Sequence, residues 1–152
     1  MQKRVYFFII LAFTIGSSSY SQNNPNNNRS FTDTIIKIEM ILSAFGVESD
    51  NFPSIHADVD FKTGLSICKK TFFNPAFKDS AYSLTKKEIA TILEILNKTD
   101  LKKLKKEYTV NVTDQPSSTT TIYTSKQKFV IEDYGLKGEY PLQELYKIVY
   151  RY

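Results

Sequence analysis

Apolar and polar residues alternate over residues 34–42 and 54–61, a pattern typical of strands that bury one face. The alternating apolar positions are Ile36, Ile38, Met40 and Leu42 in residues 34–42, and Ile55, Ala57, Val59 and Phe61 in residues 54–61. Lys62-Thr63-Gly64 then suits a tight turn, because Gly64 can adopt a positive φ. Residues 65–73 return as the partner strand. The pattern predicts a β-hairpin over residues 54–73 and a strand over 34–42, for which a short helix is the alternative.

A helical spacing replaces this alternation after residue 84. Thr85 and Glu88 match a capping box, in which the Thr hydroxyl and the Glu carboxylate accept hydrogen bonds from free backbone N–H groups. The apolar stripe of this helix follows at i, i+3, i+4 and i+7 and consists of Ile89, Ile92, Leu93 and Leu96. Asp100 is then expected to cap a second, shorter helix, whose inward residues would be Leu101, Leu104 and Tyr108.

The last third of the chain predicts two more strands and one more helix. Residues 119–124 and 128–133 form a second hairpin, and a final helix begins near Pro141. Its apolar stripe is Leu142, Leu145, Tyr146 and Val149. The order of elements favours an α+β fold: an antiparallel β-sheet built from two hairpins, with two central helices and a C-terminal helix packed on it.

The N-terminus has the three parts of a secretory signal peptide. Lys3 and Arg4 precede an apolar run over residues 5–15, which is too short for a bilayer span of about 20 residues. Small residues follow, and they place the cleavage site before Gln22. We therefore expect an exported protein.

The sequence predicts three parts. Residues 1–21 are expected to be the signal peptide, residues 22–30 a disordered Asn-rich spacer, and residues 31–152 a single α+β domain. The destination would be the periplasm or the cell exterior. No lipid anchor is expected because the signal region contains no Cys, and no transmembrane segment is expected in the mature chain.

Charge and cysteine content restrict the partners and the source of stability. Removal of Lys3 and Arg4 lowers the formal net charge of +4 by two, so the mature chain lacks the basic surplus typical of nucleic-acid-binding domains. We expect no nucleic acid partner. Cys68 is the one cysteine in the sequence, so an internal disulfide is excluded and the apolar core must stabilise the fold.

Short motifs from Tyr108 onward resemble an uncharacterised family of secreted bacterial proteins, called domain of unknown function 6438. The matching residues are Tyr108, Asp114-Gln115-Pro116, Thr121-Ile122-Tyr123 and Asp133-Tyr134-Gly135, together with the hairpin over residues 54–73. The family's Cys-Phe-Gly-x-Cys-Pro segment is replaced by Ala44-Phe45-Gly46 and Phe52-Pro53. The resemblance covers roughly residues 35–150. The resemblance implies secretion and a shared fold, and it implies no particular activity.

Few residues offer catalytic or metal chemistry. His56 alternates with Asp58 and Asp60 on one strand face, but such residues stand roughly 7 Å apart on a flat surface. We therefore favour a solvated face and predict no metal site and no cofactor. No Gly-x-Ser-x-Gly motif occurs, and Cys68 lies within a strand, where a packed thiol is expected. No catalytic residue is assigned.

Two further groups of residues have a structural and a functional interpretation. Lys102, Lys103, Lys105 and Lys106 suit the solvated face of a short helix, with contact to anionic lipid or polysaccharide as the alternative. Residues near the second hairpin suit turn formation, with contact to a ligand or partner as the alternative. The candidate binding residues are Asp114, Gln115, Tyr123, Lys128, Asp133 and Tyr134.

The sequence favours a non-enzymatic binding or protein-interaction module, with an envelope protein or glycan as its partner and an oligomeric state left open. One alternative is a small hydrolase of envelope polysaccharide that uses acidic residues of the strands, among Asp58, Asp60, Asp114, Glu132 and Asp133. A secreted enzyme inhibitor is the other.

Overall fold

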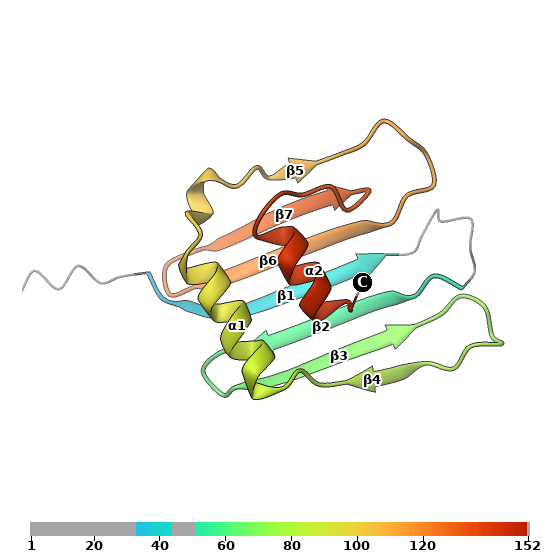
Figure 1. Cartoon of the computed structure of the whole chain (residues 1–152), viewed down its shortest axis with the longest axis horizontal. Helices are drawn as coiled ribbons and strands as arrows, with labels where there is room; N and C mark the ends of the chain where they lie inside the picture. Colours follow the sequence, from blue (N-terminus) through green and yellow to red (C-terminus); the bar gives the residue numbers. More distant parts are fainter. Residues whose placement is uncertain (1–32, 44–50, 152) are drawn as a thin grey trace, which may run out of the picture. The chain divides into compact units, whose positions relative to one another are not determined.

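The computed structural model describes residues 33–43 and 51–151, which form one seven-stranded sheet and two short helices (Figure 1). The strands are β1 (Ile35–Ser43), β2 (Ser54–Asp60), β3 (Leu65–Thr71), β4 (Ser80–Tyr82), β5 (Glu107–Tyr108), β6 (Ser117–Thr124) and β7 (Lys128–Tyr134). The helices are α1 (Lys86–Asn97) and α2 (Leu142–Val149), and a short 3-10 turn, η1, covers Leu101–Lys103. The predicted signal peptide, the Asn-rich spacer and Ala44-Phe45-Gly46 lie outside the described residues.

The sheet is mixed, so the predicted antiparallel sheet of two hairpins is wrong. Its strand order is β4-β3-β2-β1-β6-β7-β5. β1 lies between the two hairpins and pairs antiparallel with both, since Ile38 is opposite Val59 on β2 and Ile122 on β6. β5 pairs parallel with β7 at the far edge. The strand predicted over 34–42 is therefore the centre of the sheet, and the helical alternative for it is excluded.

The predicted second central helix is also wrong. Asp100 caps only η1, and Leu104 already has an extended backbone. Lys102 and Lys106 would be like charges at i, i+4 on that helix, which disfavours a segment already too short to be stable. The segment after η1 pairs with β7 instead of continuing as a helix. The Glu132 N–H donates to the Lys106 carbonyl oxygen (2.9 Å), just before β5 begins. The structure is thus mostly β, with two helices rather than three.

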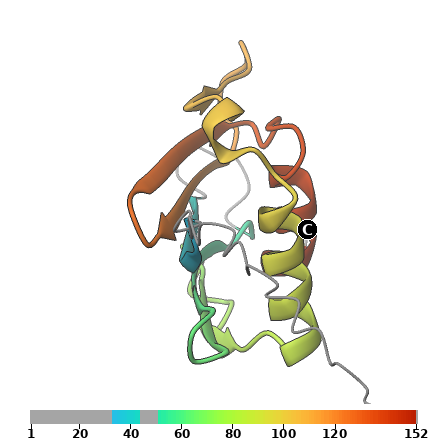
Figure 2. The same ribbon diagram turned by 90° about the vertical axis from the view of Figure 1, so that its left-hand side faces the viewer.

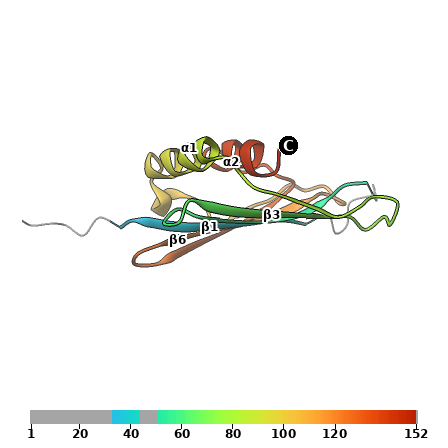
Figure 3. The ribbon, with the colours of Figure 1, turned by 90° about the horizontal axis from the view of Figure 1, so that it is seen from below.

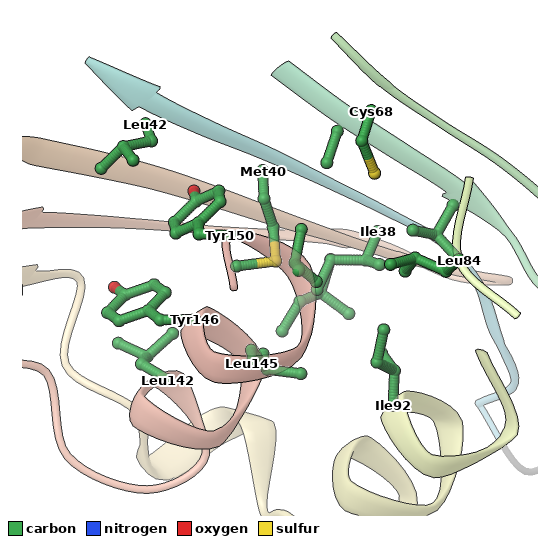
Figure 4. Close-up of a cluster of buried hydrophobic side chains, with 14 of the residues drawn as sticks. Ile38, Met40, Leu42, Cys68, Leu84, Ile92, Leu142, Leu145, Tyr146 and Tyr150 are labelled. Atoms are coloured by element: carbon green, nitrogen blue, oxygen red, sulfur yellow. The ribbon is translucent and has the colours of Figure 1, made fainter. Parts of the chain in front are cut away.

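Both helices pack on the same face of the sheet (Figures 2 and 3). α1 begins with the predicted capping box: Thr85 accepts a hydrogen bond from the Glu88 N–H (3.2 Å), and the Glu88 carboxylate accepts one from the Thr85 N–H (2.6 Å). The core between helices and sheet is apolar and includes Ile38, Met40, Leu42, Ile92, Ile122, Leu142, Leu145 and Val149 (Figure 4). No helix of the described residues is long and apolar enough to cross a membrane.

A β-bulge at the start of β1 changes the predicted inward residues. The register of β1 against β6 shifts between Ile35 and Lys37. As a result Ile35 is buried and Ile36 only half-buried. A bulge places two residues opposite one, so strict alternation cannot predict which residue points inward. From Ile38 onward the predicted alternation matches the structure.

Candidate functional site

The face of the sheet opposite the helices is the main surface on which the candidate residues gather; no described helix covers it (Figure 3). The register aligns its side chains in three cross-strand rows over β3, β2, β1, β6 and β7. The rows are Leu65, Asp60, Lys37, Tyr123 and Lys128; Ile67, Asp58, Glu39, Thr121 and Val130; and Lys69, His56, Ile41, Thr119 and Glu132. We call this surface the open face.

A hydrogen-bonded cluster occupies the centre of the open face. The Tyr123 hydroxyl donates to Glu39 Oε2 (2.9 Å), and His56 Nε2 lies 3.1 Å from Glu39 Oε1. Lys37 forms an ion pair with Asp58, and its Nζ lies 5.7 Å from the centre of the Tyr123 ring. The cluster joins residues from β1, β2 and β6, and neighbouring strands supply each other's partners. Its charged groups are therefore largely compensated within the face.

The pKa values follow from these contacts. The hydrogen bonds from Tyr123 and His56 hold the pKa of Glu39 below its usual value. The bond between Tyr123 and Glu39 also raises the pKa of the Tyr123 hydroxyl, because the donated hydrogen bond is lost when Tyr123 ionises. Asp58 raises the pKa of Lys37 through their hydrogen bond. These shifts favour the charged forms of Glu39 and Lys37, so the cluster is stable as an ionised network at neutral pH.

Aliphatic side chains flank the cluster. Leu65 and Ile67 on β3 are 68% and 58% exposed, and Ile41 and Val130 are 42% and 38% exposed. Scattered single apolar residues are common on surfaces. Here four of them lie on the same face as a half-buried Tyr, which is the mixture of aromatic and aliphatic groups found in protein interfaces.

The three β2 residues considered as metal ligands, His56, Asp58 and Asp60, contact other protein groups instead. His56 contacts Glu39, Asp58 pairs with Lys37, and Asp60 accepts hydrogen bonds from the N–H groups of Lys62 (2.8 Å) and Thr63 (2.9 Å). Within the described ranges, no group of three or more His, Cys, Asp or Glu residues is placed to hold a metal ion.

The hydrolase alternative draws its carboxylates from β2, which holds Asp58 and Asp60, and from β7, which holds Glu132 and Asp133. Asp58 on β2 and Glu132 on β7 are three strand spacings apart in the sheet, about 14 Å. Paired carboxylates of glycosidases lie about 5–9.5 Å apart. Asp133 points to the opposite, helix-covered face, where it is buried. The fold therefore does not bring the β2 and β7 carboxylates together around a bond.

Asp133 is a structural residue inside the domain. It is 1% exposed, and its Oδ1 accepts a hydrogen bond from the Lys137 N–H (2.8 Å). Its Oδ2 accepts from the Gly138 N–H (2.7 Å) and the Tyr146 hydroxyl (2.8 Å). These bonds fix the loop before α2 onto the end of β7, and burial raises the pKa of Tyr146. Asp133 is thus not placed to contact a partner.

The other candidate residues lie at the two ends of the second hairpin. Lys128 is exposed and stands opposite Tyr123 on the open face. At the other end, the Gln115 N–H donates to the Tyr134 hydroxyl (3.2 Å), and Asp114 takes a positive φ of 58° in the turn before it. Tyr123 and Lys128 therefore lie together at the turn end of the hairpin on the open face, whereas Asp114, Gln115 and Tyr134 gather at its other end.

Two residues of the central cluster, Lys37 and Glu39, were not among the candidate site residues. Their polar positions in the alternating segment 34–42 were visible, but their importance depends on the neighbours of β1. Cys68 on β3 is fully buried, and burial raises the pKa of its thiol.

Comparison with known proteins identifies one family. No curated protein and no solved structure matches the chain. The family model described as domain of unknown function (DUF6438) matches residues 51–151, from just before β2 to the end of α2. The match starts after Ala44-Phe45-Gly46 and so leaves out the front of the expected resemblance, including β1. Because it covers most of the chain, the protein belongs to the DUF6438 family.

Proposed function

We propose that this protein is an exported, non-enzymatic interaction module that binds a partner protein on the open face of its sheet. The observation that carries the proposal is the face itself: exposed aliphatic side chains flank a Tyr-centred cluster on a surface that no described helix covers. Export is supported by the charged, apolar and small-residue order of residues 1–21.

The electrostatics of the open face favour a partner with a largely uncharged contact surface. Lys37 is paired with Asp58, and Glu39 is hydrogen-bonded to His56 and Tyr123. A strongly charged partner would have to displace these contacts. Affinity should therefore come from burial of Leu65, Ile67 and the Tyr123 ring, at about 25 cal/mol per Å² of apolar surface. Binding of this kind depends little on salt, because screening acts mainly on exposed charges.

The test is capture of a partner from the host's envelope extract by the tagged protein, with washes at low and high salt. A stoichiometric partner should survive high salt. Ile67→Glu and Lys128→Ala should each weaken capture while the melting temperature stays nearly unchanged, because both side chains are exposed on the open face. Tyr123→Ala should also weaken capture, with a small decrease in melting temperature because the hydrogen bond to Glu39 is lost. Lys87→Ala on the exposed side of α1 is the matched control and should bind like wild type.

Three results would contradict the proposal. Undiminished capture by a folded Ile67→Glu variant would exclude the open face as the binding surface. Loss of folding in Tyr123→Ala would instead make Tyr123 a core residue. Retention of glycans rather than protein would assign the face to a glycan partner. Export is tested separately: N-terminal sequencing of the protein from the envelope or the medium should begin at Gln22.

A further inference from the structure

The outer edge of β7 is paired over only part of its length. On its inner side β7 pairs with β6 from Lys128 to Tyr134. On its outer side the described residues provide only Glu107 and Tyr108 of β5, which stand opposite Glu132 and Asp133. Residues 128–131 therefore have no strand neighbour on that side within the described part of the chain.

The backbone groups of this edge can be located from the register. The Glu132 N–H points outward, because it donates to the Lys106 carbonyl oxygen (2.9 Å). Residues two apart on a strand direct their N–H and C=O groups to the same side. Val130 and Lys128 therefore present main-chain groups to the outer side as well. Such unpaired edge groups are a template for another strand.

A hollow of about 370 Å³ lies at this edge. One wall is the segment from Leu101 to Lys106, which stands away from the sheet before β5 begins, and the other wall is residues 127–131. Leu101, Leu104 and Phe129 supply apolar surface. Pockets that hold ligands span about 300–1,000 Å³, so this hollow suits a short segment rather than a folded domain.

Four lysines line the hollow: Lys102, Lys105, Lys106 and Lys128. All four are exposed, and none of them forms an ion pair with a carboxylate of the described residues, whereas Lys103 beside them pairs with Asp100 (3.4 Å). The nearby acidic residues Glu107 and Glu132 line a separate hollow further along the edge. We call this site the lysine hollow. Its uncompensated positive charge is complementary to an acidic ligand.

We propose that an extended acidic peptide segment of a partner binds in the lysine hollow by adding a strand to the outer edge of β7. Its main chain pairs with Val130 and Lys128, and its carboxylates lie near the four lysines. This contact goes beyond the proposed function, since it uses the edge of the sheet and charge, whereas the open face uses side-chain burial. The two contacts share Lys128 and Val130, and Ile67, which lies outside the lysine hollow, separates the failure of one from the failure of the other.

The test measures fluorescence anisotropy of labelled decapeptides with the full-length protein at low salt. The probe alternates Thr and Glu; one control peptide alternates Pro and Glu, and another alternates Thr and Lys. The Pro–Glu peptide carries the same charge but has far fewer N–H donors for strand pairing. The Thr–Glu peptide should bind, the Pro–Glu peptide should bind about tenfold more weakly or worse, and the Thr–Lys peptide should not bind.

Variants locate the site. Lys102→Glu with Lys128→Glu should weaken Thr–Glu peptide binding about tenfold or more, because two attractions become repulsions. Lys69→Glu, an exposed lysine on β3, should have little effect. Val130→Pro removes one outward N–H and should also weaken binding, since edge strands tolerate Pro where the N–H faces out. If Val130→Pro fails to fold, hydrogen exchange of wild type replaces it: the Val130 amide should become protected when the peptide is added.

Each contrary result overturns the proposal. Equal affinity for the Thr–Glu and Pro–Glu peptides would mean charge attraction without strand addition. Binding unaffected by the double lysine reversal, or a Val130 amide that stays unprotected, would place the peptide elsewhere. Binding of anionic phosphatidylglycerol vesicles without any binding of the Thr–Glu peptide would make the lysine hollow a lipid site. Ile67→Glu should leave peptide binding unchanged, which separates this site from the open face.

Discussion

Replacement of Asp133 by Ala tests whether this residue holds the end of the sheet to α2. The side chain is buried and accepts hydrogen bonds from two backbone N–H groups, of Lys137 and Gly138, and from the Tyr146 hydroxyl. In the Ala variant these donors lose their acceptor. The bonds of the Gly138 N–H and the Tyr146 hydroxyl are themselves buried, so water cannot readily replace the carboxylate.

The expected loss can be estimated from these two buried donors. A buried polar group without a partner costs about 1–3 kcal/mol. Two such groups give about 2–6 kcal/mol, and we expect a loss near 4 kcal/mol in the free energy of unfolding. A domain of this size is stabilised by about 5–15 kcal/mol in total. The variant should therefore retain about 1–11 kcal/mol and unfold at a clearly lower urea concentration than wild type.

The assay is urea unfolding followed by far-UV circular dichroism, because the sequence contains no Trp. Asp60→Ala is the matched control: Asp60 also accepts two backbone N–H groups, but in an exposed turn, where water replaces it and the cost should be about 0.5–1.5 kcal/mol. A loss below about 1 kcal/mol for Asp133→Ala, at unchanged urea dependence, would refute the structural role of Asp133.

Three further predictions concern other elements. Thr85→Ala removes the capping box of α1 and should cost about 1 kcal/mol in urea unfolding; a cost below a few tenths would contradict the cap. The folded-state pKa of Glu39 is lowered, so its contribution to stability is present above its unfolded pKa and is lost as pH falls through the folded value. Glu39→Gln should therefore destabilise the protein more at pH 7 than at pH 2, and equal destabilisation at both would exclude this linkage. The buried Cys68 should react with a thiol reagent only at the rate of unfolding, and fast labelling of the native protein would show that it is accessible.

The elements with a strong local signal were predictable from the sequence. The hairpin of β2 and β3 is specified by alternation and by Gly64, which has the expected positive φ of 67°. The capping box and apolar stripe specify α1. In each case residues close in sequence determine the element, since they contact each other or share one buried face.

The elements that depend on distant pairing were not predictable. β4 and β5 have three and two residues, too few for any alternation to be visible. The segment from Asp100 to Tyr108 has a helical apolar spacing, but its lysines disfavour a helix and β7 offers hydrogen bonds at its end. Tertiary pairing therefore overrides the local pattern here, and it also converts the expected antiparallel sheet into a mixed one.

The residues of the candidate site were likewise predictable only in part. Tyr123 and Lys128 were chosen from the second hairpin, and the structure does place both on the open face. The sequence predicts Asp133 as a binding residue because it borders the second hairpin, yet alternation along β7 directs its side chain inward, two residues after Ile131. Lys37 and Glu39 became relevant only because β1 lies between β2 and β6. Which side chains meet on a sheet face depends on strand order, and strand order is not encoded in any single strand.

The separation of the two faces also explains why a change at the exposed positions of the open face need not unfold the domain. The buried side chains of the central strands, such as Met40, Ala57 and Ile122, all point toward the helices. The open-face residues between them in sequence, such as Ile41 and Tyr123, contribute few contacts to that core. A charge introduced at Ile67, already 58% exposed, should therefore leave folding intact while it disrupts a docked partner. The binding test on the open face can consequently distinguish a lost interface from a lost fold, which is rarely possible when binding residues are also core residues.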